Sequence, residues 1–161
     1  MRVIPYILYA LLIGFHQVIL KDLVGIAEFT FNIPVLVVLL VALYKDETIA
    51  MWFGFAAGLT MSAGEPLLLG WNGLIMAVLG LAGFHVRQRL NLDSLYSKLL
   101  MVLGGVFLYN LIWTLVGGAA GFFHLLWAEV LFGTLYTGFF AWLFFLFKEK
   151  IITWQRTKEL F

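Results

Sequence analysis

The sequence predicts an all-α integral membrane protein, a bundle of six transmembrane helices with both ends of the chain in the cytoplasm. Apolar side chains make up 63% of its 161 residues and charged ones 12%, against about 45–50% and about 25% in soluble domains. The charged residues also divide the chain into apolar windows close to the roughly 17–25 residues that a membrane span needs. Finally, the basic residues fall almost entirely in alternate connections. A single transmembrane domain is expected.

Each predicted helix follows from one apolar window or part of one. The first window follows Arg2, and the second opens near Pro34, which suits the first turn of a helix. The longest window is interrupted between Gly117 and Gly121 by a cluster of small residues that weakens a helix, so a turn is expected there. The predicted helices lie near 3–20, 33–45, 48–64, 66–86, 97–117 and 124–147, followed by a basic cytoplasmic tail over 148–161.

The basic residues predict the orientation of the bundle. An even number of spans places both termini on the same side of the membrane. With both termini inside, nine of the ten Lys and Arg residues are cytoplasmic and only Lys21 is outside. Because Lys and Arg are enriched in cytoplasmic loops, this distribution favours six spans over five or seven.

The chain carries few residues that suit catalysis or metal binding. It has no cysteine, and it lacks a zinc-binding His-Glu-x-x-His helix, a Gly-x-Ser-x-Gly elbow and a phosphate-binding loop. His16, His85 and His124 lie near the ends of predicted helices, where an interfacial or hydrogen-bonded role is favoured over a metal ligand. We therefore expect no enzyme activity, no cofactor, no metal and no nucleic-acid partner.

Five residues are candidates for lining a pocket that opens to the outside. Asn110 lies midway along the fifth predicted helix, where an interhelical hydrogen bond is favoured over ligand binding. Glu129 lies about one turn into the sixth, and carboxylates in a membrane are candidates for function. Glu65 precedes a helix and would complement its dipole. Alternatively, Glu65, Trp71, Asn72 and Glu129 share an outward-facing pocket.

Small residues predict where helix backbones approach each other. Gly54 and Gly58 are four residues apart and form a flat stripe, and Ala10 with Gly14 gives a related face. Such spacing permits close packing of membrane helices. A contact inside the chain is favoured over a contact with another chain, and a homo-oligomer is left open.

A family resemblance rests on the residues between Phe31 and Gly70. Here Asn-Ile-Pro enters a short Val/Leu-rich helix, a charged Lys-Asp-Glu turn follows, and Gly54-Phe55-x-x-Gly58-Leu59 precedes Leu69-Gly70. This order resembles the MreD family of bacterial rod shape-determining membrane proteins, and the likeness in size and span number covers essentially the whole chain. The sequence departs from the family at Ser62, where Asp is usual, and lacks a Pro around Gly138–Trp142.

The resemblance implies a fold and a function. The fold would be similar to that of the substrate-binding subunits of energy-coupling-factor transporters. The function would be that of a non-catalytic scaffold in the cell-elongation complex, which helps to position peptidoglycan synthesis and determine rod shape. Its partners would be the single-span protein MreC, together with MreB, RodA and the transpeptidase that works with RodA. The chain would be a multi-pass protein of the bacterial cytoplasmic (inner) membrane, in contact with membrane lipids.

Two other functions remain open at this point. A vitamin-binding subunit of an energy-coupling-factor-type transporter would also have six spans, and its segment 21–32 could cap an outer pocket. The scarcity of polar side chains speaks against a soluble ligand. A membrane enzyme that acts through Glu65 or Glu129 is the weaker alternative.

Overall fold

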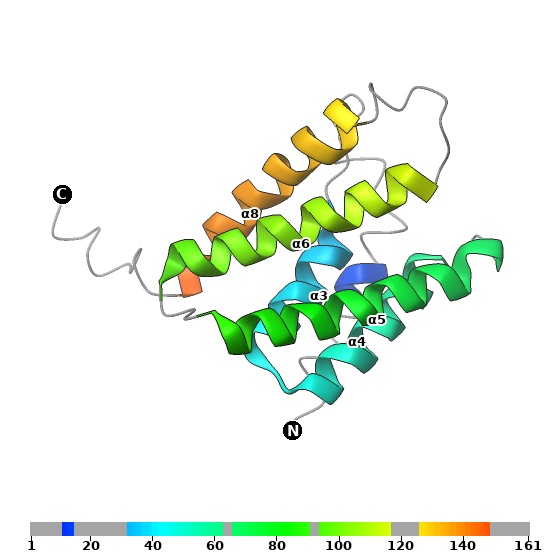
Figure 1. The fold of residues 1–161 in the computed structure, drawn as a ribbon, viewed down its shortest axis with the longest axis horizontal. Helices are drawn as coiled ribbons and strands as arrows, with labels where there is room; N and C mark the ends of the chain where they lie inside the picture. The colour runs from blue at the N-terminus through cyan, green and yellow to red at the C-terminus, as the bar shows by residue number, and fades with distance from the viewer. Residues whose placement is uncertain (1–10, 15–31, 63–65, 91–93, 117–125, 149–161) are drawn as a thin grey trace, which may run out of the picture.

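The computed structural model describes residues 11–14, 32–62, 66–90, 94–116 and 126–148, and over these residues the chain is helical and contains no strand (Figure 1). The short segment 11–14, which falls within the first predicted helix, is helical. The remaining helices are α3 (Ile33–Tyr44), α4 (Glu47–Met61), α5 (Pro66–Arg89), α6 (Leu95–Val116), the π-helix η2 (Leu126–Phe132) and α8 (Gly133–Lys148).

Three of these helices are long and apolar enough to cross a membrane, at Leu68–Arg89, Leu95–Leu115 and Val130–Lys148. The third of these spans joins the end of η2 to α8. Helices α3 and α4 are shorter, with 12 and 15 residues. The structure therefore describes an all-helical protein with three candidate spans, and a total of six spans remains a prediction. The greater part of the first predicted helix, and the tail after Lys148, lie outside the described residues.

Local hydrogen bonds explain where several helices begin and end. Helix α6 starts at Leu95, two residues before its predicted start, because the Ser94 hydroxyl accepts a hydrogen bond from the backbone N–H of Ser97 at 3.1 Å. Such a serine cap satisfies one of the free donors of a helix N-terminus. Helix α4 ends at Met61, short of its predicted end, and the backbone N–H of Ser62 turns back to the Leu59 carbonyl.

The helices alternate in direction along the chain. Contacts between α4 and α5 join Ala50 to Gly80, Gly54 to Met76 and Gly58 to Asn72. Because residue numbers rise along α4 as they fall along α5, the two helices are antiparallel. Contacts between α6 and α8 join Leu103 to Gly138 and Asn110 to Thr134, so this pair is antiparallel as well. Figure 1 shows the two pairs on either side of α3.

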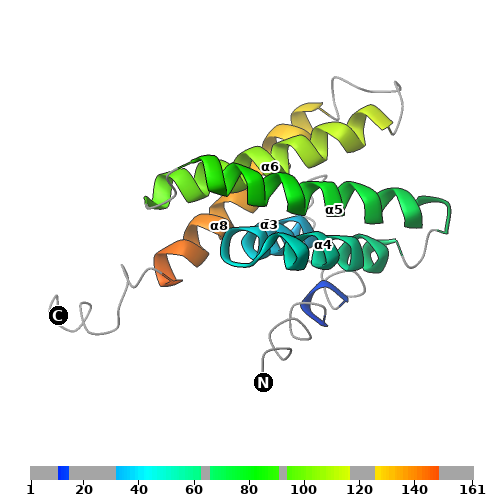
Figure 2. The same ribbon diagram turned by 60° about the horizontal axis from the view of Figure 1, so that its bottom comes forward.

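Helix α3 is the centre of the bundle and contacts α4, α5, α6 and α8 (Figure 2). Ten of its twelve residues are buried, as expected of a helix that is apolar on every face. Twelve residues span only about 18 Å, whereas the hydrocarbon core of a bilayer is about 30 Å thick. Both ends of α3 therefore need hydrogen-bond partners supplied by the protein.

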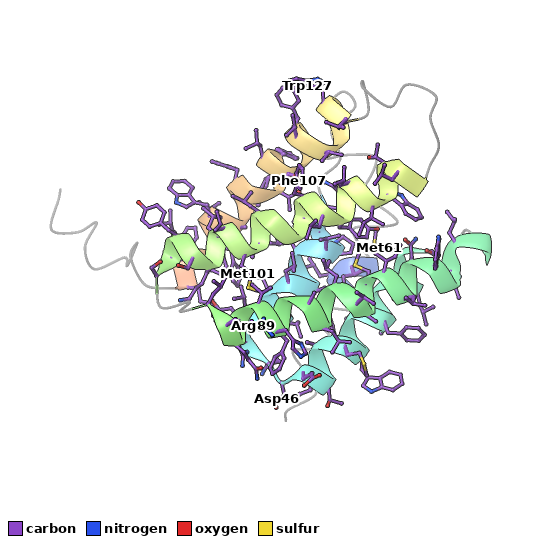
Figure 3. All side chains as sticks on the ribbon, viewed as in Figure 1. Asp46, Met61, Arg89, Met101, Phe107 and Trp127 are labelled. Carbon is purple, nitrogen blue, oxygen red and sulfur yellow. The ribbon has the colours of Figure 1, made fainter. Side chains whose placement is uncertain are left out.

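The basic residues gather at one end of the bundle. Helices α3, α5 and α8 finish there, and α4 and α6 begin there. Every Lys and Arg that the structure describes belongs to this basic end, which we define as Lys45, Arg87, Arg89, Lys98 and Lys148. In Figure 3, Arg89 and Asp46 lie toward this end, and Met61 lies toward the opposite one.

Candidate interhelical polar site

A buried polar site surrounds the residue that precedes α3. The side-chain amide of Asn32 donates a hydrogen bond to Oδ1 of Asn110 on α6, at 2.9 Å. Asn32 makes no side-chain cap on its own helix. Asn110 is only 9% exposed, so its amide depends on protein partners, since an unpaired amide in an apolar environment costs several kcal/mol. The hydrogen bond thus ties the start of the central helix to α6.

Two threonines of α8 extend this site. The backbone N–H of Asn32 donates to Oγ1 of Thr137 at 3.3 Å, and the Asn110 amide donates to Oγ1 of Thr134 at 3.5 Å. The Thr137 hydroxyl in turn donates to the Gly133 carbonyl at 2.8 Å. We call Asn32, Asn110, Thr134 and Thr137 the asparagine–threonine network. It joins α3, α6 and α8 through neutral groups alone.

A second buried polar pair lies between α4 and α5. The Asn72 side-chain amide donates to the Ser62 hydroxyl, and both residues are more than nine-tenths buried. Oδ1 of Asn72 accepts no hydrogen bond from the residues that the structure describes, which is uncommon for a buried polar atom. Met61, the residue before Ser62, accepts a hydrogen bond at its thioether from the Tyr109 hydroxyl of α6, at 4.0 Å. The Ser62–Asn72 pair holds the end of α4 against α5 and leaves one acceptor of Asn72 unused.

The other end of α3 is closed by an arginine of α5. Nη1 of Arg87 donates to the carbonyls of Ala42, Leu43 and Lys45, at 3.3, 2.9 and 3.0 Å. The guanidinium also lies 5.0 Å from the centroid of the Phe84 ring. A cation at this position satisfies carbonyls that the helix cannot bond itself and complements the negative end of the helix dipole.

The described residues of the predicted pocket, Trp71, Asn72 and Asn110, lie in different surroundings. Trp71 is 51% exposed on the outer surface, whereas the neighbouring Asn72 faces inward, because successive residues on a helix point about 100° apart. Asn72 and Asn110 have different hydrogen-bond partners and belong to separate polar groups. A pocket shared by Glu65, Trp71, Asn72 and Glu129 stays a prediction. Glu65 and the side chain of Glu129 lie outside the described residues.

The glycine stripe of α4 lies inside the chain. A methyl group added to Gly54 would overlap the backbone carbonyl of Met76, and one added to Gly58 would overlap that of Asn72. Helix α5 therefore occupies this stripe and leaves no room for a partner's helix there. In contrast, a methyl group on Gly14 would meet nothing within 4 Å, and Ala10 lies outside the described residues.

Several residues of the polar site were not predicted from the sequence. Asn32 falls in the segment 21–32, which the sequence predicts as an outer loop, and Thr134 and Thr137 fall in an apolar window. The sequence does carry a signal for these residues, because each is a polar residue in an otherwise apolar segment. Asn32 comes just before a helix that begins with a proline, and the two threonines are three residues apart. Asn110 was singled out, and it makes the interhelical hydrogen bonds that its position within a helix favours.

Comparison of the chain with protein-family models, curated proteins and solved structures finds no match. Within the described part of the chain, no three His, Cys, Asp or Glu residues gather in a group that could hold a metal ion. The fold and the site thus define an α-helical membrane protein in which buried amides, hydroxyls and one arginine hold a short central helix in place.

Proposed function

We propose that the chain is a non-catalytic membrane scaffold of the bacterial cell-elongation complex, of the MreD type. In this proposal it spans the cytoplasmic membrane six times, with both termini inside, and binds the single-span protein MreC. MreB, RodA and its transpeptidase would assemble around the pair, so that peptidoglycan synthesis follows the rod. The fold would be that of the energy-coupling-factor substrate-binding subunits.

One observation supports this proposal most directly. Several of the residues that carry the resemblance to MreD make contacts between helices. Asn32 connects the start of α3 to α6, while Gly54 and Gly58 let the backbone of α4 touch α5. This use of the motif favours a scaffold protein, because these residues contribute packing contacts and no reactive groups.

The described surface could receive the span of a partner. Large apolar side chains are exposed along one face of the segment formed by η2 and α8, at Phe132, Leu135, Phe139 and Trp142. Their spacing of three, four and three residues keeps them on one side of a helix. On α6, Gly104 is exposed, with nothing within 4 Å of an added methyl group. Exposed glycine on an apolar helix permits close approach of another helix.

A transporter subunit that binds a vitamin is the second candidate. The observation in its favour is the unused Oδ1 of Asn72, because a buried acceptor without a partner suits a ligand that donates a hydrogen bond. Its neighbour Ser62 is already engaged with the amide of Asn72. A small polar ligand held at this one acceptor would be the structural basis of that function.

Capture of partners by the full-length tagged chain separates the two functions. The chain is co-expressed with MreC, extracted in mild detergent and analysed by mass spectrometry and by a thermal-shift assay with vitamins. The scaffold proposal predicts recovery of MreC in a fixed ratio and no vitamin-induced shift. A folded chain that is stabilised by a vitamin and recovers no MreC would contradict it.

Two glycine variants serve as matched controls for that experiment. Gly104→Leu adds a side chain on the open surface of α6, so the chain should remain folded, and any loss of MreC would locate the docking surface there. Gly54→Leu forces α4 away from α5, and overpacking costs about 1–3 kcal/mol or more. The second variant should lose its fold and MreC together, which distinguishes a failed bundle from a failed contact.

A further inference from the structure

Helix α4 is much shorter than the helix beside it. Its 15 residues cover about 22 Å, whereas the 24 residues of α5 cover about 36 Å. The two helices run side by side, because the contacts of Ala50 with Gly80 and of Gly58 with Asn72 keep one register. A tilt of the pair shortens both helices in the same proportion. Helix α4 is therefore shorter than the roughly 30 Å of hydrocarbon in a bilayer, whatever the tilt.

Most of this shortfall lies at the basic end. The register between the two helices places Glu47, the first residue of α4, at the level of Gly83 on α5. Asp46 precedes it, and both acidic residues are exposed. Helix α5 continues from Gly83 to Arg89, which is about 9 Å further along its axis (Figure 1). Two exposed carboxylates are thus held more than one turn inside the end of the neighbouring span.

Two exposed tryptophans on the same pair of helices are also close together along its axis. Trp52 of α4 is 60% exposed, and Trp71 of α5 is 51% exposed. Trp71 lies at the level of Leu59, so the two tryptophan backbones are only about 10 Å apart along the axis. Their rings lean apart, because helical side chains lean toward the N-terminus of their own helix and these helices are antiparallel. Even so, the rings are closer than the two interfaces of an ordinary bilayer, which tryptophan prefers.

We propose that this side of the bundle thins the bilayer beside it and prefers phospholipids with short acyl chains. We call it the α4–α5 face and define it by its exposed apolar residues, which are Trp52, Phe55, Trp71, Leu74, Val78 and Ala82. Charged side chains are costly in hydrocarbon, and a bilayer relieves a short apolar belt by local thinning.

The other side of the bundle provides an internal comparison. There the candidate spans Leu95–Leu115 and Val130–Lys148 have 21 and 19 residues, which match an ordinary bilayer. The protein therefore presents a thin apolar belt on one side and a full one on the other. This inference needs α5 to span the membrane, and it stands apart from the scaffold proposal because it needs neither MreC nor the elongation complex.

Single cysteines in the full-length protein test the thinning, in vesicles of dioleoylphosphatidylcholine. The chain has no cysteine of its own, and a thiol reacts with N-ethylmaleimide through its thiolate, which forms in water and not in hydrocarbon. Ala82→Cys lies five residues before Arg87, and the control Phe144→Cys lies four residues before Lys148, both at exposed positions. We expect Ala82→Cys to react severalfold faster, although it lies further from its charged end. Equal rates would overturn the proposal.

Competition between two lipids tests the preference for short chains. The purified protein is equilibrated with equal amounts of dimyristoleoyl- and dierucoylphosphatidylcholine, and the retained lipid is identified by native mass spectrometry. We expect the shorter lipid to be retained about two- to tenfold better, since mismatch costs a fraction of a kcal/mol per ångström. Equal retention of the two lipids would contradict the proposal, and fast labelling of Ala82→Cys would then mean that water enters beside α4 without thinning.

A pair of double variants shows whether the length of the apolar belt is the cause. Asp46→Leu with Glu47→Leu extends the belt at the basic end, so it should slow the labelling of Ala82→Cys and reduce the preference for the shorter lipid. Asp46→Asn with Glu47→Gln removes the same charges but keeps polar groups there, so it should retain most of both. Equal effects of the two variants would assign the behaviour to charge and overturn the proposal. Asp46 makes no side-chain cap on α4, and circular dichroism checks that the helices are retained.

Discussion

The two ends of α3 are closed by different chemistry, although they belong to one buried twelve-residue helix. At the N-terminal end, the asparagine–threonine network uses neutral amides and hydroxyls from α6 and α8. At the C-terminal end, Arg87 of α5 supplies a charged donor to three carbonyls. The comparison teaches that a short helix inside a bundle needs its missing hydrogen bonds satisfied by neighbours.

The difference between the ends follows from what each end lacks and from where it lies. A helix N-terminus has unused N–H donors, which need acceptors, and neutral oxygen atoms meet this need without burying a charge. A C-terminus has unused carbonyls, and a cation both donates to them and complements the dipole. The C-terminal end of α3 lies among the other basic residues of the bundle, where charges can reach headgroups and water.

Removal of Arg87 should have the largest effect on stability. In Arg87→Leu, three carbonyls lose their charged donor, and we expect a loss of about 2–4 kcal/mol. The measurement is unfolding in increasing SDS, followed by tryptophan fluorescence. Arg87→Lys should recover part of the loss, since an ammonium can still donate. Arg89→Leu, which removes an exposed charge on the same helix, should cost much less; an equal cost would show that Arg87 acts through charge alone.

Asn110→Leu should have the next largest effect. Leu is branched at Cγ like Asn, but it leaves the Asn32 amide without its acceptor, and interhelical hydrogen bonds in membranes contribute about 0.6–1.7 kcal/mol each. We expect a loss of about 1–2 kcal/mol in the same unfolding assay. A double-mutant cycle with Asn32→Ala isolates the contact. Additive effects of the two substitutions would contradict a direct interaction between these side chains.

Thr137→Val should have a smaller effect at the same end. The substitution retains the shape of the side chain and removes the acceptor of the Asn32 backbone N–H, at a cost of about 0.5–1 kcal/mol. Thr60→Val is the matched control, because the Thr60 hydroxyl donates only to the Ala56 carbonyl of its own helix. A loss for Thr60→Val as large as that for Thr137→Val would mean that the contact between α3 and α8 contributes nothing.

Part of the polar site could be predicted from the sequence, and part could not. Asn110 was predictable, because an amide in the middle of an apolar window must find a partner. Its partner Asn32 lies 78 residues away, and nothing local identifies it. Trp71 and Asn72 are adjacent in sequence and were grouped in one pocket, yet the rotation of α5 places one outside and the other inside.

The sequence by itself determined where α3, α4, α5 and α6 lie, because apolar windows, Pro34 and the charged turn after α3 act on neighbouring residues. It also determined that Gly54 and Gly58 form a flat stripe, which is a matter of helical spacing. Only the tertiary structure decided that α5 covers this stripe and that Arg87 closes α3. These contacts join residues far apart in the chain, and they depend on how the helices pack, which no local pattern specifies.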